Sequence, residues 1–509
     1  MLSSVLSFGR LGIEGYPMRV EVDVREALPS MEMVGLPDAA VKESRERVRT
    51  AMKNSGFTFP AAQITVNLAP ADIKKEGPWY DLPIALGIMA SSSQIKVESL
   101  NGLLILGELS LDGTVGKVVG ALPMLLAARK QGVKRALLPV ENAKECACVS
   151  GIDVYPVMSL KTAVAFLRGQ ENLQPVAFDG YETLNNEVDP EIDLSRVKGQ
   201  YAARRALEIA ASGGHNLLLI GTAGSGKTML ARALPGILPR MTEEEALETT
   251  VIHSVTSGFE GGLMTRRPFS APHHTTSAAA LIGGGRNAMP GEISLAHNGV
   301  LFLDELPEYP RPVLESLRQP MEDGEVTVSR VNARCVYPAR FQLVCAMNPC
   351  PCGNFGSRTK ECRCTPHEVQ RYLSRISGPL LDRIDMVVEM DAVTPEEVFE
   401  SRQEPESSAT IRIRVEKARE VQRKRFEGNN YYANARIPSK VLEETCRRTD
   451  DAQALLMRCM KEMGLSMRAY TRVLRVARTI ADMEGCEIIE QRHIAEAVSY
   501  RSVNEKYWN

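Results

Sequence analysis

The sequence lacks the features that mark a membrane, secreted or strongly charged protein. Its longest apolar stretch, Leu82 to Ala90, is far shorter than the roughly 20 residues that a membrane-spanning helix needs. Arg10 interrupts the apolar N-terminus before the long apolar region of a secretory signal develops. The 509 residues carry a formal net charge of only −2 and 5% aromatic residues, so global charge neither supports nor excludes nucleic acid as a partner. We therefore expect a cytoplasmic protein with no membrane partner.

The eleven cysteines do not indicate a disulfide framework, because their number is odd and they are scattered over a long chain. They favour reduced thiols or a metal site. A chain of 509 residues is long enough for about three domains, each with its own core.

Composition and hydrophobic periodicity divide the chain into four segments. Residues 1–168 alternate short strands with amphipathic helices and predict an α+β domain. Residues 169–190 are polar and weakly periodic, which is typical of a linker. Residues 191–393 carry apolar strand-like runs separated by helical patterns, which predicts a parallel α/β sheet. Residues 394–509 are helical in pattern, with one helix expected over Val441 to Met463.

The strongest chemical signal is one octapeptide between a predicted strand and a predicted helix. It reads Gly221, Thr222, Ala223, Gly224, Ser225, Gly226, Lys227, Thr228. This is the pattern of a phosphate-binding P-loop, whose glycines let backbone N–H groups approach phosphate oxygens. In such a loop Lys227 reaches the β- and γ-phosphates and the Thr228 hydroxyl binds Mg²⁺. The alternative is a glycine-rich turn that matches the pattern by chance.

A second motif supports nucleotide hydrolysis. Residues 299–303 read as a buried strand, and Asp304 and Glu305 follow it directly. This is the arrangement of a Walker B element, in which Asp304 holds the Mg²⁺ shell and Glu305 polarises the attacking water. A further apolar strand over residues 341–347 ends in the amide of Asn348, which we expect to face the same ligand-binding crevice. ATP and Mg²⁺ are therefore the expected cofactors.

Together, these pieces resemble AAA+ ATPases of the magnesium-chelatase-like branch, and within it the ComM/YifB type, over essentially the whole chain. Further runs that carry the resemblance are Gly214–Asn216, Ala271–Thr275, Pro290–Gly299 and Ser377–Asp385. The resemblance implies an α/β fold: an AAA+ P-loop NTPase core with a parallel sheet and a helical lid, preceded by an α+β domain similar to that of Lon protease.

The resemblance also implies roles for residues outside the two nucleotide motifs. It makes Asn348 the sensor 1 residue that orients the attacking water, and Arg468 the sensor 2 contact to the γ-phosphate. It makes Arg383 an arginine finger that reaches the γ-phosphate of a neighbouring subunit, which requires a ring. Gly199 and Gln200 stand where the family holds the adenine base.

Both arginines also have simpler interpretations. Arg383 lies between Asp382 and Asp385 in the sequence, and it can form an ordinary salt bridge with either carboxylate. Arg468 can be a solvated arginine at the start of a helix.

Residues 74–87 and 107–128 resemble the protease domain of Lon, but the two catalytic positions differ. Lon-type chemistry needs a serine after a Gly-Pro step and a lysine base near the start of the following helix. Here Trp79 follows the Gly-Pro step, and the segment 118–123 has no lysine. We therefore predict a scaffold or collar without peptidase activity.

Two insertions are expected to serve the substrate. The segment Ser270–Pro290 stands where this branch carries an insert in helix 2, and Glu325–Val336 has the alternation of a β-hairpin with a Val331-Asn332 turn. In related motors such elements project into the pore of the ring. Arg330 and Arg334 on the hairpin would then follow a DNA phosphate backbone, or else they are solvated surface charges.

A cluster of cysteines lies between the expected sensor 1 residue and the expected finger. Two C-x-C pairs separated by nine residues comprise Cys350, Cys352, Cys362 and Cys364. Four thiolates can close a tetrahedral Zn²⁺ site, with His367 as an alternative ligand, or they are reduced loop thiols. A bound Zn²⁺ would stiffen this loop and perform no chemistry.

The leading functional hypothesis is an ATP-driven ring, hexameric in form, that acts on single-stranded or branched DNA. By its resemblance it is expected to be a branch-migration helicase that assists homologous recombination during natural transformation. The alternatives are a motor subunit of a magnesium chelatase and an ATPase that remodels proteins. The choice between DNA and the other substrates rests on the resemblance, since no residue pattern selects one of them.

Overall fold

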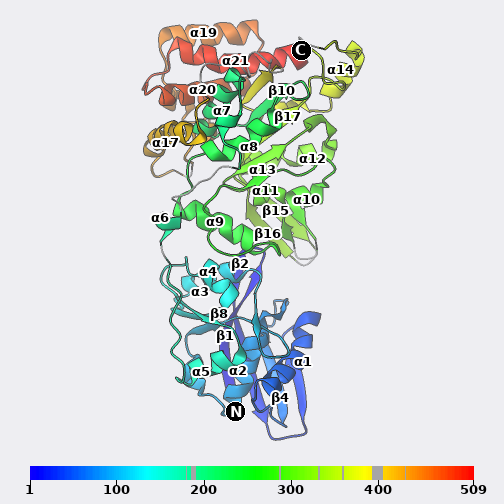
Figure 1. Cartoon of the computed structure of the whole chain (residues 1–509), viewed down its shortest axis with the longest axis vertical. Coiled ribbons are helices and arrows are strands. Elements are labelled where there is room, and N and C mark those ends of the chain that lie inside the picture. The colour runs from blue at the N-terminus through cyan, green and yellow to red at the C-terminus, as the bar shows by residue number, and fades with distance from the viewer. Residues whose placement is uncertain are drawn as a thin grey trace.

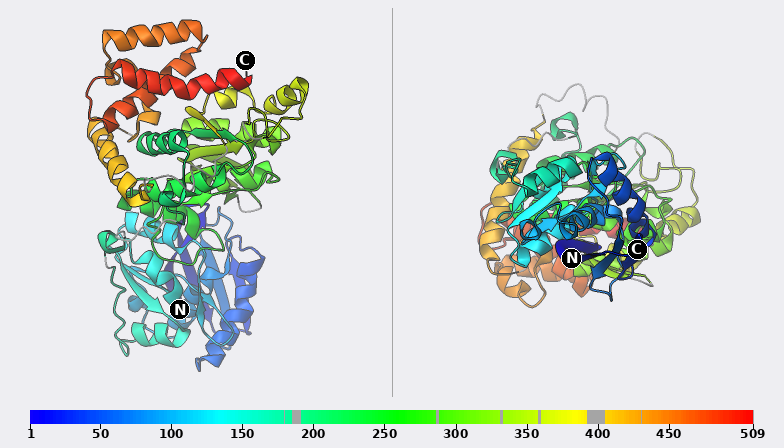
Figure 2. Two further views of the ribbon diagram at one scale, coloured as in Figure 1. Left: turned by 45° about the horizontal axis from the view of Figure 1, so that its top comes forward. Right: turned by 90° about the horizontal axis from the view of Figure 1, so that it is seen from below.

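The computed structural model describes most of the chain. The described residues are 1–178, 180–184, 191–285, 288–330, 333–357, 360–391, 405–429 and 431–508. They form an elongated stack, with an N-terminal domain at one end, a central sheet and its helices in the middle, and C-terminal helices at the other end (Figures 1 and 2). No helix in these ranges is both long and apolar enough to cross a membrane.

The N-terminal domain is built on a seven-stranded mixed sheet in the order β3-β4-β2-β1-β5-β8-β9. Its strands are β1 (Leu2–Leu11), β2 (Glu14–Arg25), β3 (Ser30–Val34), β4 (Gln63–Ala69), β5 (Leu103–Ile105), β8 (Arg135–Pro139) and β9 (Asp153–Val157), and a separate short ribbon pairs β6 (Glu108–Leu109) with β7 (Val115–Gly116). Its helices are α1 (Ala39–Asn54), α2 (Asp81–Ser91), α3 (Ala121–Lys130), α4 (Val140–Cys146) and α5 (Leu160–Leu167). On β2, Val20 and Val22 are fully buried, as their alternation in the sequence predicts. The predicted α+β fold of this part is confirmed.

The central domain contains a parallel five-stranded sheet in the order β11-β14-β17-β10-β18. The strands are β11 (Phe269–Ser270), β14 (Val300–Leu303), β17 (Gln342–Met347), β10 (Leu217–Gly221) and β18 (Met386–Met390). Every residue of β10, β14 and β17 is buried, because helices cover both faces of a parallel sheet. The predicted parallel sheet is therefore confirmed, and its carboxyl edge brings together the residues that follow β10, β14 and β17.

Helices and two ribbons complete the central domain. Its helices are α6 (Tyr181–Leu184), α7 (Tyr201–Gly213), α8 (Lys227–Ile237), α9 (Glu243–Ser254), α10 (Ala278–Ile282), α11 (Glu292–Leu295), α12 (Arg311–Ser316), α13 (Arg318–Asp323), α14 (Pro366–Leu373) and α15 (Gly378–Leu381). The predicted hairpin is present as β15 (Glu325–Arg330) paired with β16 (Ala333–Pro338), while its Val331-Asn332 turn lies outside the described residues. The segment Ser270–Pro290 holds α10 and the ribbon of β12 (Gly283–Gly284) with β13 (Met289–Pro290).

The C-terminal part is helical, as predicted. It contains α17 (Ser408–Arg425), α18 (Leu442–Thr445), α19 (Asp450–Glu462), α20 (Met467–Met483) and α21 (Gln491–Trp508). The single helix expected over Val441 to Met463 is wrong, because the chain leaves helical geometry after Thr445. There the backbone N–H of Thr449 donates to Ile489 O at 3.0 Å, and the Thr449 side chain caps α19.

The predicted domain boundaries stay predictions. Residues 185–190 of the expected linker and the expected boundary at 393/394 lie outside the described residues. Within the described part, α5 belongs to the N-terminal domain and α7 to the central domain, and the residues between them include the short helix α6 and a 3-10 helix over Leu194–Arg196.

A buried charge network holds the C-terminal helices together. The carboxylate of Asp482 on α20 accepts hydrogen bonds from Arg425 at 2.8 and 2.5 Å, from Asn434 at 2.8 Å and from Arg478 at 3.1 Å. The side chains of Arg478 and Asp482 are each only 1% exposed. The two arginines come from different helices, so this one carboxylate joins α17 to α20.

We expect Asp482→Ala to destabilise the C-terminal part by about 3 to 5 kcal/mol, because it leaves buried arginines without a counter-charge. The measurement is urea unfolding followed by Trp508 fluorescence in a Trp79→Phe background. Glu462→Ala, at the exposed end of α19, is the matched control and should change stability by less than about 0.5 kcal/mol. Equal effects of the two substitutions would contradict this role of Asp482.

Candidate functional site

The octapeptide folds as a loop between β10 and α8, as a P-loop requires. Gly224 and Gly226 have φ values of +80° and +90°, which side chains other than glycine rarely adopt. The loop therefore turns its backbone N–H groups towards the start of α8, where an anion is stabilised by these donors and by the helix dipole.

The ammonium of Lys227 lies inside this loop. It donates hydrogen bonds to the carbonyl oxygens of Gly221 at 2.7 Å and Thr222 at 2.9 Å, and to Asn348 Oδ1 at 3.2 Å. Burial lowers the pKa of Lys227, and the nearby carboxylate of Asp304 partly opposes this shift. The predicted sensor 1 residue and the P-loop lysine are therefore in direct contact.

The two residues predicted to hold Mg²⁺ are also in contact. Thr228 Oγ1 donates to Asp304 Oδ2 at 2.8 Å. Adjacent ligands of an octahedral Mg²⁺, each about 2.1 Å from the ion, lie about 3 Å apart. The hydroxyl and the carboxylate thus fit a shared Mg²⁺ in both chemistry and spacing.

Glu305 has a strained backbone and an imidazole partner. Its φ and ψ of 52° and 48° place it in the left-handed region, which is uncommon outside glycine and frequent at functional sites. Glu305 Oε2 lies 3.2 Å from Nδ1 of His274, whose ring centroid is 4.0 Å from that of His273. No sequence motif assigns His274 a role in the chemistry. The signal that points to it is the position of His274 soon after β11, the neighbour of the strand that precedes Glu305.

Gln200 contacts the P-loop from the side. Its Nε2 donates to Ser225 O at 3.2 Å and to Asp391 O at 2.6 Å. Gln200 follows Gly199 and precedes α7, and both residues have positive φ. The Gln200 side chain therefore lies beside the loop. Its contact with an adenine base stays a prediction.

Arg383 and Arg468 contact other groups. Arg383 forms an ion pair with Glu322 and donates to Pro379 O at 2.7 Å, and its side chain is 9% exposed. Arg468 is 69% exposed, with Nη1 3.5 Å from Asp382 Oδ2. Arg383 therefore forms an ion pair, as its simpler interpretation predicts. The predicted partner, Asp382 or Asp385, is wrong, because the carboxylate is that of Glu322.

The backbone at Arg383 is fixed by the start of two strands. Asn216, just before β10, donates through Nδ2 to Arg383 O at 3.1 Å and accepts from the Leu343 N–H of β17 at 2.9 Å. Its own N–H donates to Asp385 Oδ2 at 2.8 Å. The segment that carries Arg383 is thus attached to the amino edge of the sheet.

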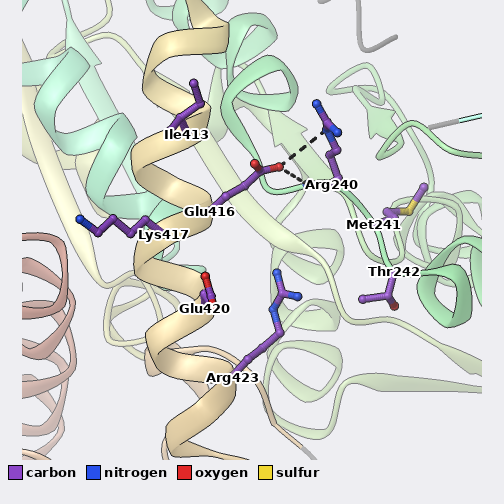
Figure 3. Close-up of a pocket in the computed structure, with 8 residues that line it drawn as sticks. All are labelled: Arg240, Met241, Thr242, Ile413, Glu416, Lys417, Glu420 and Arg423. Atoms are coloured by element: carbon purple, nitrogen blue, oxygen red, sulfur yellow. Dashed lines mark hydrogen bonds and ion pairs between the residues drawn. The ribbon is translucent and has the colours of Figure 1, made fainter. Parts of the chain in front are cut away.

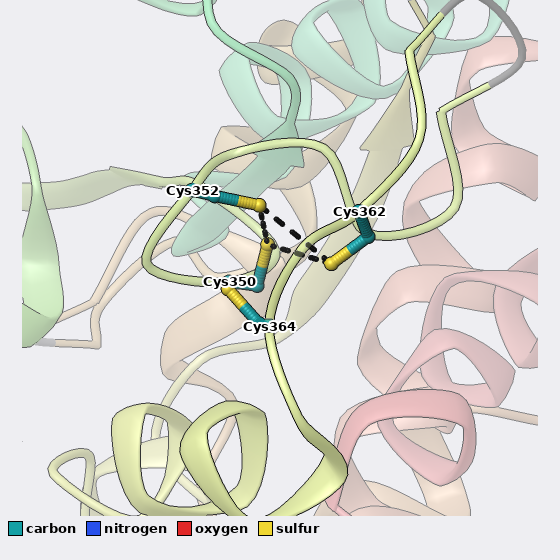
Figure 4. Close-up of side chains that lie close together, drawn as sticks. All are labelled: Cys350, Cys352, Cys362 and Cys364. Carbon is teal, nitrogen blue, oxygen red and sulfur yellow. Dashed lines mark hydrogen bonds between the residues drawn. The ribbon is translucent and has the colours of Figure 1, made fainter.

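The four predicted zinc ligands converge at one point (Figure 4). Cys350 Sγ lies 3.4 Å from Cys352 Sγ and 3.7 Å from Cys362 Sγ, and the Sγ atoms of Cys352 and Cys362 are 3.6 Å apart. Thiolates bound to a tetrahedral Zn²⁺ at about 2.3 Å lie about 3.8 Å apart. Cys364 belongs to the same group, and the alternative ligand His367 on α14 does not. The sulfur positions therefore fit Zn²⁺.

The cysteine loop also touches the nucleotide site. The Phe355 N–H donates to Cys350 Sγ at 3.3 Å, which shapes the loop around Gly353. A Cβ placed on Gly353 would lie 3.8 Å from both the Ala223 nitrogen of the P-loop and Asn348 Cγ. The loop thus forms a wall beside the P-loop and the sensor 1 position.

The residues expected to contact DNA are on the hairpin. Arg334 is exposed on β16, and Arg330 ends β15, although the Arg330 side chain lies outside the described part.

A cavity of about 540 Å³ lies between α17 and the segment 240–242 (Figure 3), where Arg240 Nε lies 3.9 Å from Glu416 Oε1. Acidic and basic groups alternate around this cavity, so it offers no uniform surface for a polyanion.

At the Lon-like positions, the structure places buried side chains. Trp79 stands at the serine position and is 8% exposed, with the Arg10 guanidinium 5.9 Å from its ring centroid. The segment 118–123, where a lysine base is expected, has no lysine, and its residues Leu122 and Pro123 are buried in the first turn of α3. None of these side chains can act as a nucleophile or base.

Three family models match successive parts of the chain. Residues 20–142 match the model for subunit ChlI of Mg-chelatase, residues 193–398 match magnesium chelatase, subunit ChlI, and residues 405–501 match the C-terminal part of magnesium chelatase subunit ChlI. Together these matches cover most of the N-terminal domain, the central domain and the C-terminal helices.

Similar proteins are known in several bacteria. The chain is 44% identical over 508 residues to competence protein ComM of Haemophilus influenzae, covering 99% of this chain and 98% of ComM. It is 44% identical over 505 residues to the uncharacterized protein YifB of Escherichia coli, covering 99% of this chain and 97% of YifB. It is 31% identical over 121 residues to Lon protease 2 of Bacillus subtilis, covering 24% of this chain and 21% of that protease, and the Lon-like similarity lies in the N-terminal region. With nearly full-length similarity to ComM and YifB, and with P-loop and Walker B residues in contact at one edge of its parallel sheet, the chain belongs to the ComM/YifB family of magnesium-chelatase-like AAA+ proteins.

Proposed function

We propose that this protein hydrolyses ATP at the P-loop and uses the energy to move DNA, as a branch-migration helicase in homologous recombination. The observation that carries the ATPase part is the convergence of Lys227, Thr228, Asp304 and Asn348 from three strand ends. The name of the Haemophilus relative, competence protein ComM, supports a role in natural transformation.

Each residue of the site has a defined task in hydrolysis. Lys227 exchanges its loop carbonyls for the β- and γ-phosphate oxygens of ATP, and Asn348 orients the attacking water. Glu305 accepts a proton from that water after its carboxylate leaves His274. Thr228 and Asp304 would hold Mg²⁺, which supplies charge neutralisation at the phosphates when bound.

The two arginines contact the γ-phosphate in this proposal. Arg383 pairs with Glu322, and Arg468 Nη1 lies 3.5 Å from Asp382 Oδ2, so each arginine now contacts a carboxylate outside the P-loop. We assign Arg383 to the γ-phosphate of a neighbouring subunit in a hexameric ring, and Arg468 to a second contact with the γ-phosphate. A charge supplied in trans stabilises the transition state only where two subunits meet, so it couples hydrolysis to assembly.

The hairpin is the proposed DNA contact. Arg330 and Arg334 lie on β15 and β16, and two cations on one hairpin can follow successive phosphates of a single strand. We place the protein in the cytoplasm, because none of its eleven cysteines, all within the described residues, forms a disulfide.

The four-cysteine cluster is the second part of the proposal. We assign it to a structural Zn²⁺ that fixes the loop next to Gly353. The sulfur spacing supports this assignment, and so does the N–H donated to Cys350, since such donors stabilise thiolates.

Lys227→Ala is expected to lower the rate of ATP hydrolysis about 100-fold or more, because it removes a charge that stabilises the transferred phosphoryl group. Steady-state hydrolysis is measured without nucleic acid and then with single-stranded, duplex and four-way-junction DNA. Lys424→Ala is the matched control, since Lys424 is 75% exposed on α17. We expect single-stranded or junction DNA to stimulate the wild-type protein and the control. A rate indifferent to DNA would contradict the helicase proposal and direct the search to a chelatase partner or to unfolded protein.

Arg383→Ala is expected to abolish hydrolysis alone and to regain it in mixtures with Lys227→Ala. In a mixed ring, the first variant supplies an intact P-loop and the second supplies an intact finger to it. The measurement is ATPase activity across mixing ratios after co-assembly. A normal rate for Arg383→Ala alone, in assembled rings, would show that the residue is no finger.

Protein purified without exposure to a chelator is expected to contain about one zinc ion per chain, because four thiolates complete a closed tetrahedral site. Metal content is measured by plasma mass spectrometry. Cys362→Ser should lower the content sharply, while Cys459→Ser, a partly exposed cysteine outside the cluster, should leave it unchanged. If the purified protein contains no stoichiometric metal, the Zn²⁺ proposal is wrong and the four cysteines are reduced thiols.

A further inference from the structure

The Arg383 side chain is engaged by its own chain. One guanidinium nitrogen pairs with Glu322, another donates to Pro379 O at 2.7 Å, and the buried Nε has no hydrogen-bond partner. The arginine therefore has to leave a specific partner before it can reach a phosphate on a neighbouring subunit.

The partner can be exchanged at low cost. Glu322 is 58% exposed, whereas the Arg383 side chain is 9% exposed. Water can solvate the carboxylate once the arginine leaves, so breaking the pair strands no buried negative charge. Glu322 also lines a cavity of about 910 Å³, which gives its side chain room to move.

Glu322 stands at the root of the hairpin. It is the second-last residue of α13, and Gly324 connects this helix directly to β15. The Ala339 N–H donates to Gly324 O at 2.7 Å, which closes the hairpin at its base. Met321, which precedes Glu322 in α13, accepts a hydrogen bond from Arg436 through its carbonyl oxygen at 3.1 Å. A displacement of Glu322 is therefore expected to displace the base of β15 and β16 as well.

We propose that Glu322 is a positioning residue that links the arginine finger to the hairpin. While Arg383 is paired with Glu322, α13 and the hairpin base are tied to the segment that carries Arg383. When a neighbouring γ-phosphate draws Arg383 away, this tie is released and the base of the hairpin can shift. Loss of the γ-phosphate returns Arg383 to Glu322 and resets the hairpin. This inference rests on the proposed role of Arg383 in trans.

The proposal is tested by hydrogen exchange of the β15 and β16 amides in the assembled full-length protein, with and without a non-hydrolysable ATP analogue. In the wild type, the analogue should speed exchange at the hairpin base at least about fivefold. In Glu322→Gln, exchange should already be fast without nucleotide and respond little to it. Glu322→Asp, which keeps the charge, should behave as an intermediate. Asp323→Asn, the adjacent acid on the same helix, is the matched control and should match the wild type.

A second readout separates this proposal from the finger itself. Glu322→Gln should keep ATPase activity within about threefold of the wild type but lose most of its strand displacement per ATP, since chemistry persists without transmission to the hairpin. Arg383→Ala should share the fast hairpin exchange and also lose hydrolysis. If Arg383→Ala is inactive while Glu322→Gln exchanges like the wild type, the link is wrong and the finger stands. If Arg383→Ala hydrolyses ATP normally, the finger is wrong and the nucleotide-driven release falls with it.

Discussion

The buried ammonium of Lys227 is the charge around which the nucleotide site is arranged. Because it is only 8% exposed, it needs compensation from nearby dipoles and carboxylates. It finds the carbonyls of Gly221 and Thr222 and the amide oxygen of Asn348, with Asp304 close enough to oppose the fall in its pKa. Asn348 comes from a different strand, so the site exists only when β10 and β17 lie side by side. An arriving phosphate supplies full negative charge where the lysine otherwise has mainly dipoles, which favours binding.

The opposite edge of the same strands fixes a second group of charges. Asn216 holds the backbone of Arg383, and Asp385, 1% exposed, pairs with Arg472 of α20 at 2.5 Å. The backbone at Arg383 is therefore attached to the sheet and to the C-terminal helices. The Arg383 side chain, in contrast, pairs with Glu322, an exposed carboxylate. One parallel sheet thus places the expected nucleotide site at its carboxyl edge and fixes the backbone of Arg383 at its amino edge.

Local patterns were enough to predict the parallel sheet, the P-loop and the Walker B element, because each depends on residues adjacent in the sequence. The ion pair of Arg383 was not predictable in this way. The neighbouring sequence offers Asp382 and Asp385 as partners, whereas the structure brings Glu322 from 61 residues away. The contact between His274 and Glu305 likewise depends on β11 and β14 being neighbours, which no local pattern states. Sequence thus specified the groups expected to bind phosphate, and only the fold specified which carboxylates pair with Arg383 and His274.

The Lon-like domain contacts the hairpin. At the turn between β1 and β2, a Cβ on Gly12 would lie 2.8 Å from the Tyr337 hydroxyl of β16, so the two domains meet at close range. Arg10 shapes this turn by donating to Gly12 O at 3.3 Å and to Val119 O at 3.2 Å. Trp79, which stands where Lon-type chemistry needs a serine, packs against that same arginine. A serine at this position would not provide the aromatic surface that Arg10 contacts. The residue at the expected nucleophile position therefore packs against the arginine that shapes the turn facing the hairpin.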